Sequence, residues 1–133
     1  MSVRREITTR TAHIWIDDDD IIHSDCFAGA ETTMADAEAA LAAIWEIAGQ
    51  RRLPQLVDMR AVRSVERAAR AHLAGPEAAR RNLASAILVG SPLSRAIGNF
   101  FIGINKTLIP SRLFTSQAAA MAWLRSFREG AQP

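Results

Sequence analysis

The chain has 133 residues, of which 49% are hydrophobic and 23% charged, and its formal net charge is +2. This length suits one globular domain with a single hydrophobic core and leaves no room for a second. The small net charge argues against nucleic-acid binding, because proteins that bind nucleic acids carry dense basic patches.

Hydrophobic periodicity and turn residues predict strands and helices that alternate along most of the chain. In chain order, they predict strands at 12–17 and 21–27, a helix at 33–48, a strand at 53–59, a helix at 64–73, helical turns at 76–82, a strand at 84–90, a helix at 91–105, a strand at 112–114 and a helix from 116 to 127. The acidic turn at 17–20 makes a hairpin of the first two strands.

Three local signals support these boundaries. Thr33 and Asp36 form a capping-box-like pair at the start of the first helix. Ser64 is interpreted as the N-cap of the second helix, which Gly75 and Pro76 end. The strand at 84–90 is apolar on both faces, as expected for a central strand that is covered on both sides.

The element order is therefore β-β-α-β-α-β-α-β-α. It predicts an α/β fold with a mixed sheet of four to five strands, an antiparallel opening hairpin and flanking helices. We expect a single domain over residues 1–133, with its core at about 8–127.

Targeting signals and cysteine usage point to the cytoplasm. Arg4 and Arg5 are not followed by an apolar run, so no signal peptide is expected. The longest apolar stretch, 96–109, is interrupted by polar residues and is shorter than the roughly 20 residues of a membrane span. The single cysteine, Cys26, excludes an internal disulfide and fits a reducing compartment.

Three stretches resemble a bacterial family of uncharacterised STAS/SEC14-like proteins, within the SpoIIAA-like group. They are Leu-Val-Asp-Met-Arg at 56–60, Leu-Val-Gly-Ser-Pro-Leu-Ser-Arg-Ala-Ile-Gly-Asn-Phe-Phe at 88–101, and the segment 105–116, which begins Asn-Lys and ends Pro-Ser-Arg-Leu-Phe-Thr-Ser. The resemblance spans roughly residues 8–127 and implies a SpoIIAA/STAS-like fold.

The same resemblance implies a regulatory module whose usual switch is missing. Anti-sigma-factor antagonists of this fold carry a phosphorylatable serine in an Asp-Ser-Ser-Gly type motif. Aligned from Asp58, the two serines of that motif fall on Arg67 and Ala68, so the phosphoacceptor is absent. Ser64 lies nearby, and its interpretation as an N-cap gives it no further role.

No constellation of residues predicts an enzyme, a metal site or a cofactor. Cys26 and His23 are three apart on a strand, so their side chains point to opposite faces. The acids at 17–20 lack the spacing of a calcium loop, and the three histidines are too scattered for zinc. The glycines near 90–103 lack the Gly-Lys-Ser/Thr end of a phosphate loop. We expect Gly98 to permit close packing of its helix.

Two features are candidates for a partner or ligand surface. Arg63, Arg67 and Arg70 share one helix-start face if the helix runs straight through them. The helix at 91–105 is apolar nearly all round, so it is buried or offers a second face to something else. The candidate residues are Arg63, Arg67, Arg70, Ser94, Arg95, Asn99, Phe100, Phe101, Ile102, Asn105, Lys106 and Arg112.

Three interpretations of that helix remain open. It covers the sheet and does nothing more, it self-associates or docks another protein, or it borders a cleft for an apolar ligand. In the third case Phe100, Phe101 and Ile104 line the cleft, and Asn105, Lys106 and Arg112 hold an anionic group. The sequence thus predicts a non-catalytic interaction or regulatory module. The alternative is a small protein that binds a lipid or an apolar carboxylate, and the arginines allow contact with a membrane surface.

Overall fold

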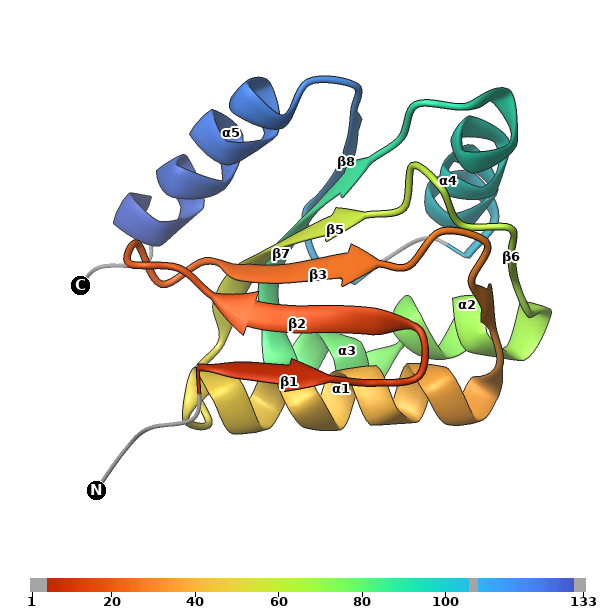
Figure 1. The fold of residues 1–133 in the computed structure, drawn as a ribbon. Helices are drawn as coiled ribbons and strands as arrows, with labels where there is room; N and C mark the ends of the chain where they lie inside the picture. The colour runs from red at the N-terminus through yellow and green to blue at the C-terminus, as the bar shows by residue number, and fades with distance from the viewer. Residues whose placement is uncertain (1–4, 106–107, 131–133) are drawn as a thin grey trace.

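The chain forms a six-stranded mixed sheet flanked by five helices, together with a separate pair of very short strands (Figure 1). The computed structural model describes residues 5–105 and 108–130, and for 100–105 and 128–130 it describes only the backbone. The strands are β1 (Glu6–Thr8), β2 (Ala12–Ile16), β3 (Ile22–Cys26), β4 (Glu31–Thr32), β5 (Leu53–Asp58), β6 (Ser64–Val65), β7 (Asn82–Leu88) and β8 (Ser111–Phe114). The helices are α1 (Met34–Ala48), α2 (Arg67–Leu73), α3 (Pro76–Arg81), α4 (Pro92–Asn105) and α5 (Gln117–Gly130).

The sheet order is β1-β2-β3-β5-β7-β8. β1, β2 and β3 are antiparallel neighbours, whereas β3, β5, β7 and β8 run parallel and are joined by helical crossovers. This arrangement confirms the predicted mixed α/β class with an antiparallel opening hairpin. The parallel strands end at one edge of the sheet, beside α2, β6 and α4 (Figure 1).

The predicted number of strands was too low. β1 is a three-residue edge strand with only Ile7 partly buried, so it carries almost no hydrophobic alternation to detect. The pair formed by β4 and β6 is two residues long on each side. Pairing with distant segments creates these strands, and periodicity within one segment does not report it.

Apolar side chains are buried on both faces of the sheet. One face packs against α5 through a cluster that includes Leu56, Leu88 and Leu124. The other face carries two separate clusters. The first packs α1 onto β2 and β3 through Ile14, Ile22 and Leu41, and the second gathers smaller numbers of residues at the carboxyl ends of β5 and β7.

The start of α1 is held by interactions from three parts of the chain. The predicted capping box is confirmed, because Thr33 and Asp36 exchange hydrogen bonds between side chain and backbone. Arg10 donates to both carboxylate oxygens of Asp36, and these bonds hold the pKa of that carboxyl well below its usual range. Glu66 accepts a hydrogen bond from the Met34 N–H at 2.8 Å.

Ser64 does not cap α2 as predicted. It lies in β6, which pairs with β4, and α2 begins three residues later at Arg67. Glu66 occupies the N-cap position without a side-chain cap bond. Its carboxylate caps α1 instead, so the polar residue nearest a helix start in sequence serves a different helix in space.

Helix α4 begins at the predicted place and packs closely through a glycine. Ser91 and Ser94 exchange hydrogen bonds at the start of this helix. The Ser94 hydroxyl accepts from the Ser91 N–H, and the Ser91 hydroxyl accepts from the Ser94 N–H, both at 3.0 Å. A methyl group added at Gly98 would lie 2.8 Å from Leu113 Cδ2 and 3.2 Å from Val89 Cγ1. The expectation that Gly98 permits close packing is confirmed.

The Asp36 interactions predict an acid-dependent contribution to stability. Asp36→Asn removes the charge that Arg10 binds, so we expect the free energy of unfolding at pH 7 to fall by about 1 kcal/mol. Because the pKa of Asp36 is lowered in the folded chain, its contribution is fully present above the unfolded pKa of about 3.9 and is lost progressively as the pH falls from there through the folded pKa.

Urea denaturation of wild type and variant between pH 3 and pH 7 checks this prediction. The difference between the two stabilities should be constant above about pH 5 and begin to narrow as the pH falls from about 4 to 3. Glu38→Gln, on an exposed position of the same helix, should change little at any pH. A constant difference between Asp36→Asn and wild type across this range would contradict the account.

The packing of Gly98 predicts a steep penalty for a larger side chain. Gly98→Val places two methyl groups against Leu113 and Val89, and overpacking of this kind lowers stability by roughly 1–3 kcal/mol. Asn99→Val is the matched control, since it introduces the same side chain at the next, exposed position of α4. Thermal unfolding should show a clear loss for the first variant and a small change for the second; equal losses would mean that helix propensity, and not packing, is responsible.

Candidate functional site

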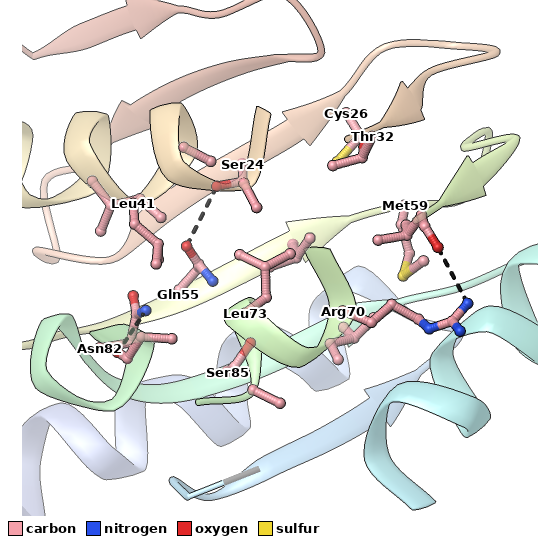
Figure 2. A pocket seen from close by; sticks show the side chains of 18 of the residues that line it. Ser24, Cys26, Thr32, Leu41, Gln55, Met59, Arg70, Leu73, Asn82 and Ser85 are labelled. Carbon is pink, nitrogen blue, oxygen red and sulfur yellow. Dashed lines mark hydrogen bonds between the residues drawn. The ribbon is translucent and has the colours of Figure 1, made fainter. Parts of the chain in front are cut away.

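A cavity of about 120 Å³ lies between α1, α2 and α3 and the sheet face that these helices cover. Figure 2 shows its walls: the helices contribute apolar side chains such as Leu41 and Leu73, and the strands form the floor. It lies where the two apolar clusters of this face fail to meet, since members of both clusters line it. The helices therefore cover this face without filling it.

A row of polar side chains crosses the floor of the cavity. Gln55 on β5 is the direct neighbour of Ser85 on β7, which is the direct neighbour of Ser111 on β8. Ser24 on β3 completes the row by donating to Gln55 Oε1 at 3.4 Å. We call Ser24, Gln55, Ser85 and Ser111 the polar row. Parallel register places all four on one face, where central strands normally carry apolar residues.

Asn82, at the start of β7, adds a fifth polar group beside this row. The ladder between β5 and β7 is irregular at Leu53 and Pro54, where Pro54 has no N–H to donate, and Asn82 pairs with Leu53 there. Its Nδ2 donates to the Ala78 carbonyl at 3.1 Å. Its Oδ1 is buried and accepts no hydrogen bond from any described residue.

The polar row has unused hydrogen-bonding capacity as well. Gln55 and Ser85 are each 8% exposed. Within the described part of the chain, Gln55 Nε2 donates to no residue and Ser85 Oγ makes no hydrogen bond. A buried polar atom without a partner costs about 1–3 kcal/mol, and Asn82 Oδ1 carries that cost unless something in the cavity binds it.

Arg70 contributes a cation at the other end of the cavity. It projects from α2, lines the cavity, and its Nη1 donates to the Val65 carbonyl at 3.2 Å. In Figure 2 its guanidinium points toward α4, away from Gln55 and Asn82. The cavity therefore has a neutral polar end and a cationic end, separated by apolar walls.

Cys26 also lines the cavity, but its environment disfavours a nucleophile. Burial, with the nearby charges of Asp58 and Asp25, raises the pKa of its thiol to about 12. His23 lies on the opposite face of β3, as predicted, where it stacks on Trp15 with ring centroids 4.0 Å apart and bonds to Asp17 at 2.8 Å. His23 is therefore not placed to act as a base for the thiol.

A second feature is the edge where the parallel strands end. Hydrogen bonds join the three loops there: Gly29 N–H donates to the Ala61 carbonyl, and the Ser91 hydroxyl donates to the Arg60 carbonyl. Five exposed residues belong to the segments that follow β3, β5 and β7 at this edge, and we call them the carboxyl-edge surface: Phe27, Arg63, Arg67, Leu93 and Arg95. Phe27 is 42% exposed and Leu93 51% exposed, which is unusual for large apolar side chains.

The predicted common face of Arg63, Arg67 and Arg70 was wrong. Arg63 precedes β6, where it approaches Glu31 at 4.0 Å, and only Arg67 and Arg70 belong to α2. The prediction assumed that the helix already includes Arg63, whereas α2 begins at Arg67. Arg67 is exposed, whereas Arg70 turns inward to the cavity.

Two further candidates lie away from any surface shared with these arginines. Ser94 is fully buried in the capping interactions of α4, which removes it from the predicted surface. Arg112 is exposed on β8, with its guanidinium 5.3 Å from the ring of Phe114. Arg95 and Asn99 are exposed on α4.

The remaining candidates belong to the end of α4. Phe100, Phe101, Ile102 and Asn105 lie in the helix, but their side chains are outside the described part of the structure, as is Ile104. Lys106 lies outside the described residues altogether. The predicted cleft beside Phe100 and Phe101 is therefore not tested.

Sequence reasoning missed the polar row and Asn82. A signal was present, since Gln55 and Ser85 interrupt otherwise apolar strands. It was weak, because one polar residue in a strand does not reveal its neighbours, and the register that aligns Gln55 with Ser85 and Ser111 is a property of the folded sheet.

The described residues contain neither a cluster of metal-ligating side chains nor a membrane-spanning helix. Over 5–105 and 108–130, no group of three or more histidine, cysteine, aspartate or glutamate side chains is arranged to hold a metal ion. In the same residues, no helix has the length and apolar character needed to cross a membrane.

Solved structures share this fold. An uncharacterised protein of the DUF3478 family with a SpoIIAA-like fold, from Shewanella loihica PV-4, is 17% identical with a TM-score of 0.63, over 93% of this chain and 98% of that one. An anti-sigma factor antagonist from Mycobacterium paratuberculosis is 19% identical with a TM-score of 0.58, over 86% of this chain and 93% of that one. These similarities confirm the SpoIIAA/STAS-like fold.

Sequence comparison identifies the family. No curated protein matches the chain. A protein of unknown function from Arthrobacter sp. FB24 is 36% identical over 90% of this chain and 96% of that one, with a TM-score of 0.35. The model of the family described as Domain of unknown function (DUF7793) matches residues 14–128, and the chain belongs to that family.

Proposed function

We propose that this domain is a non-catalytic interaction module of the STAS-like type, which binds an acidic surface of a partner protein through the carboxyl-edge surface. The observation that carries the proposal is the exposure of Leu93 and Phe27 on the same edge segments as three exposed arginines. Exposed apolar residues surrounded by charge are typical of protein interfaces, whose anchors are apolar or arginine side chains.

The charges at this edge favour an acidic partner. Within the described residues, no carboxylate forms an ion pair with Arg67 or Arg95. Arg63 and Glu31 are 4.0 Å apart with both side chains mostly exposed, so that pair contributes little and leaves Arg63 accessible. Complementary charge chiefly speeds encounter and selects the partner, whereas burial of Leu93 and Phe27 supplies affinity.

A role without phosphorylation at α2 is consistent with this surface. Arg67 and Ala68 stand where the resemblance to anti-sigma antagonists places two serines, and both are exposed at the start of α2. A fixed cation there replaces a group that would become negative on phosphorylation. Binding would then respond to something other than a phosphate on this helix.

The protonated state of the Cys26 thiol supports the non-catalytic part of the proposal. A thiol with a pKa near 12 is protonated at neutral pH, and the protonated form is a poor nucleophile. His23 is engaged with Asp17 and Trp15 on the opposite face of the sheet from Cys26.

Site-specific photo-crosslinking in the native host tests the proposal. With the Leu93 side chain replaced by p-benzoylphenylalanine, ultraviolet light should give one or a few discrete adducts with acidic proteins. The same photo-reactive residue at Ala42, which is exposed on α1 and does not belong to the carboxyl-edge surface, should give none of them. Arg63→Glu combined with Arg67→Glu should reduce the adducts at least fivefold.

The control variant reverses two arginines elsewhere. Arg51→Glu with Arg125→Glu changes the same number of charges beside the hairpin acids Asp20 and Asp19, and should leave the adducts intact. No specific adduct at Leu93, an adduct only with a second copy of the chain, or equal loss in both double variants would overturn the proposal.

A further inference from the structure

We propose that the cavity binds a small neutral molecule, with an apolar body about the size of one six-membered ring and one amide-like group that both donates and accepts hydrogen bonds. This site goes beyond the proposed docking function and does not depend on it. The amide-like group binds Gln55, Asn82 and Ser85, and the apolar body lies against Leu41, Leu73 and their neighbours on α1–α3.

Two side chains of the cavity have complementary hydrogen-bonding groups that no described residue uses. Asn82 Oδ1 is an acceptor without a donor among the described residues, and Gln55 Nε2 is a donor without an acceptor there. Both line one cavity from adjacent strands, and Figure 2 shows the two side chains directed into the same space. A ligand group with one donor and one acceptor side by side satisfies both, and an amide has that pattern.

The charge of the groups around the cavity also restricts the ligand. The polar row and Asn82 are all neutral, so a carboxylate there would be buried without a cation, which is strongly unfavourable. The charged side chains that line the cavity are Asp36, which is bound by Arg10, and Arg70, which points away from this end. The neutral end therefore favours a neutral ligand and discriminates against an anionic one.

The volume and the lining of the cavity also fit a small ligand. A cavity of about 120 Å³ is similar to an engineered protein cavity of roughly 150 Å³ that binds benzene. A fully apolar cavity of this size stays dry, whereas this one has several polar groups on its floor. Specific small-molecule sites combine mostly apolar walls with a few convergent polar groups, and this cavity has that combination.

Titration with three matched probes, followed by heteronuclear NMR, tests the inference. Benzamide carries the neutral amide, benzoate carries a carboxylate on the same ring, and toluene carries neither. Benzamide should give saturable shifts with a dissociation constant of about millimolar or tighter, centred on residues of β5, β7 and α1–α3 and including the side-chain amides of Gln55 and Asn82. Benzoate and toluene should bind at least tenfold more weakly.

Variants of the row separate binding from folding. Gln55→Leu removes the amide and should weaken benzamide at least tenfold, and Ser85→Ala should weaken it severalfold with minimal change of volume. Gln117→Leu is the matched control, since it makes the same change at an exposed position on α5 and should leave binding intact. A single cooperative thermal unfolding transition confirms that each variant is folded.

Three outcomes would overturn the inference. Toluene binding as tightly as benzamide would show that the polar row does not select the ligand. Tighter binding of benzoate would assign the site to an anion. A titration in which no probe saturates would show that the cavity holds water only. None of these outcomes bears on crosslinking at Leu93, so the two proposals fail independently.

Discussion

Four polar side chains that lie in a row on one face of the sheet determine how the hydrophobic core packs on that face. Parallel register aligns Gln55, Ser85 and Ser111, and Ser24 joins them through Gln55. Apolar residues cannot pack continuously across such a row, so the core on this face divides into two clusters with a cavity between them. On the opposite face, α5 packs through one cluster that includes Leu56, Leu88 and Leu124.

This division explains the different construction of the helices on the two faces. α5 is a single amphipathic helix, whereas the other face is covered by α1, α2, α3 and α4 in separate pieces. α1 is anchored at its start by Thr33, Arg10 and Glu66, interactions that do not require a filled core beneath the helix. Polar anchoring at the rim thus compensates for incomplete apolar packing inside.

Helix α2 connects the two proposed sites. Arg67 at its start lies on the carboxyl-edge surface, and Arg70 one turn later lines the cavity. The helix is only seven residues long and its N-cap has no side-chain bond, so its position relies on packing against α1 and its neighbours. A ligand between this helix and the sheet would therefore act on the element that also presents Arg67 to a partner.

Much of the fold was predictable from the sequence because residues close together in the chain determine where most helices and strands begin and end. The Thr33–Asp36 capping box, the Gly75–Pro76 break and the apolar strand around Ile87 each depend on neighbours in the chain. The resemblance to SpoIIAA-like proteins added the fold. What failed depended on distant pairing: β1 and the β4–β6 pair were missed, and the Arg63–Arg70 face was assigned to a helix that starts later.

The candidate site was harder to predict for the same reason. Gln55 and Ser85 are thirty residues apart, and nothing in either segment shows that they are neighbours; Asn82 joins them only because the ladder is irregular at Leu53 and Pro54. The arginines of the carboxyl-edge surface were easier to predict, since Arg63, Arg67 and Arg95 were identified as candidates from the sequence. Their grouping with Leu93 and Phe27 required the folded edge of the sheet.

The central claim is that the polar row serves binding at the expense of stability. Replacing both members of its one internal hydrogen bond with apolar residues, in Ser24→Ala combined with Gln55→Leu, removes the polar groups and adds apolar contact. The most direct test is the free energy of unfolding of this double variant, measured by urea denaturation of ligand-free protein. The account predicts a stability equal to wild type or up to about 2 kcal/mol higher. A loss of more than about 1 kcal/mol would mean that the row stabilises the fold, and would contradict it.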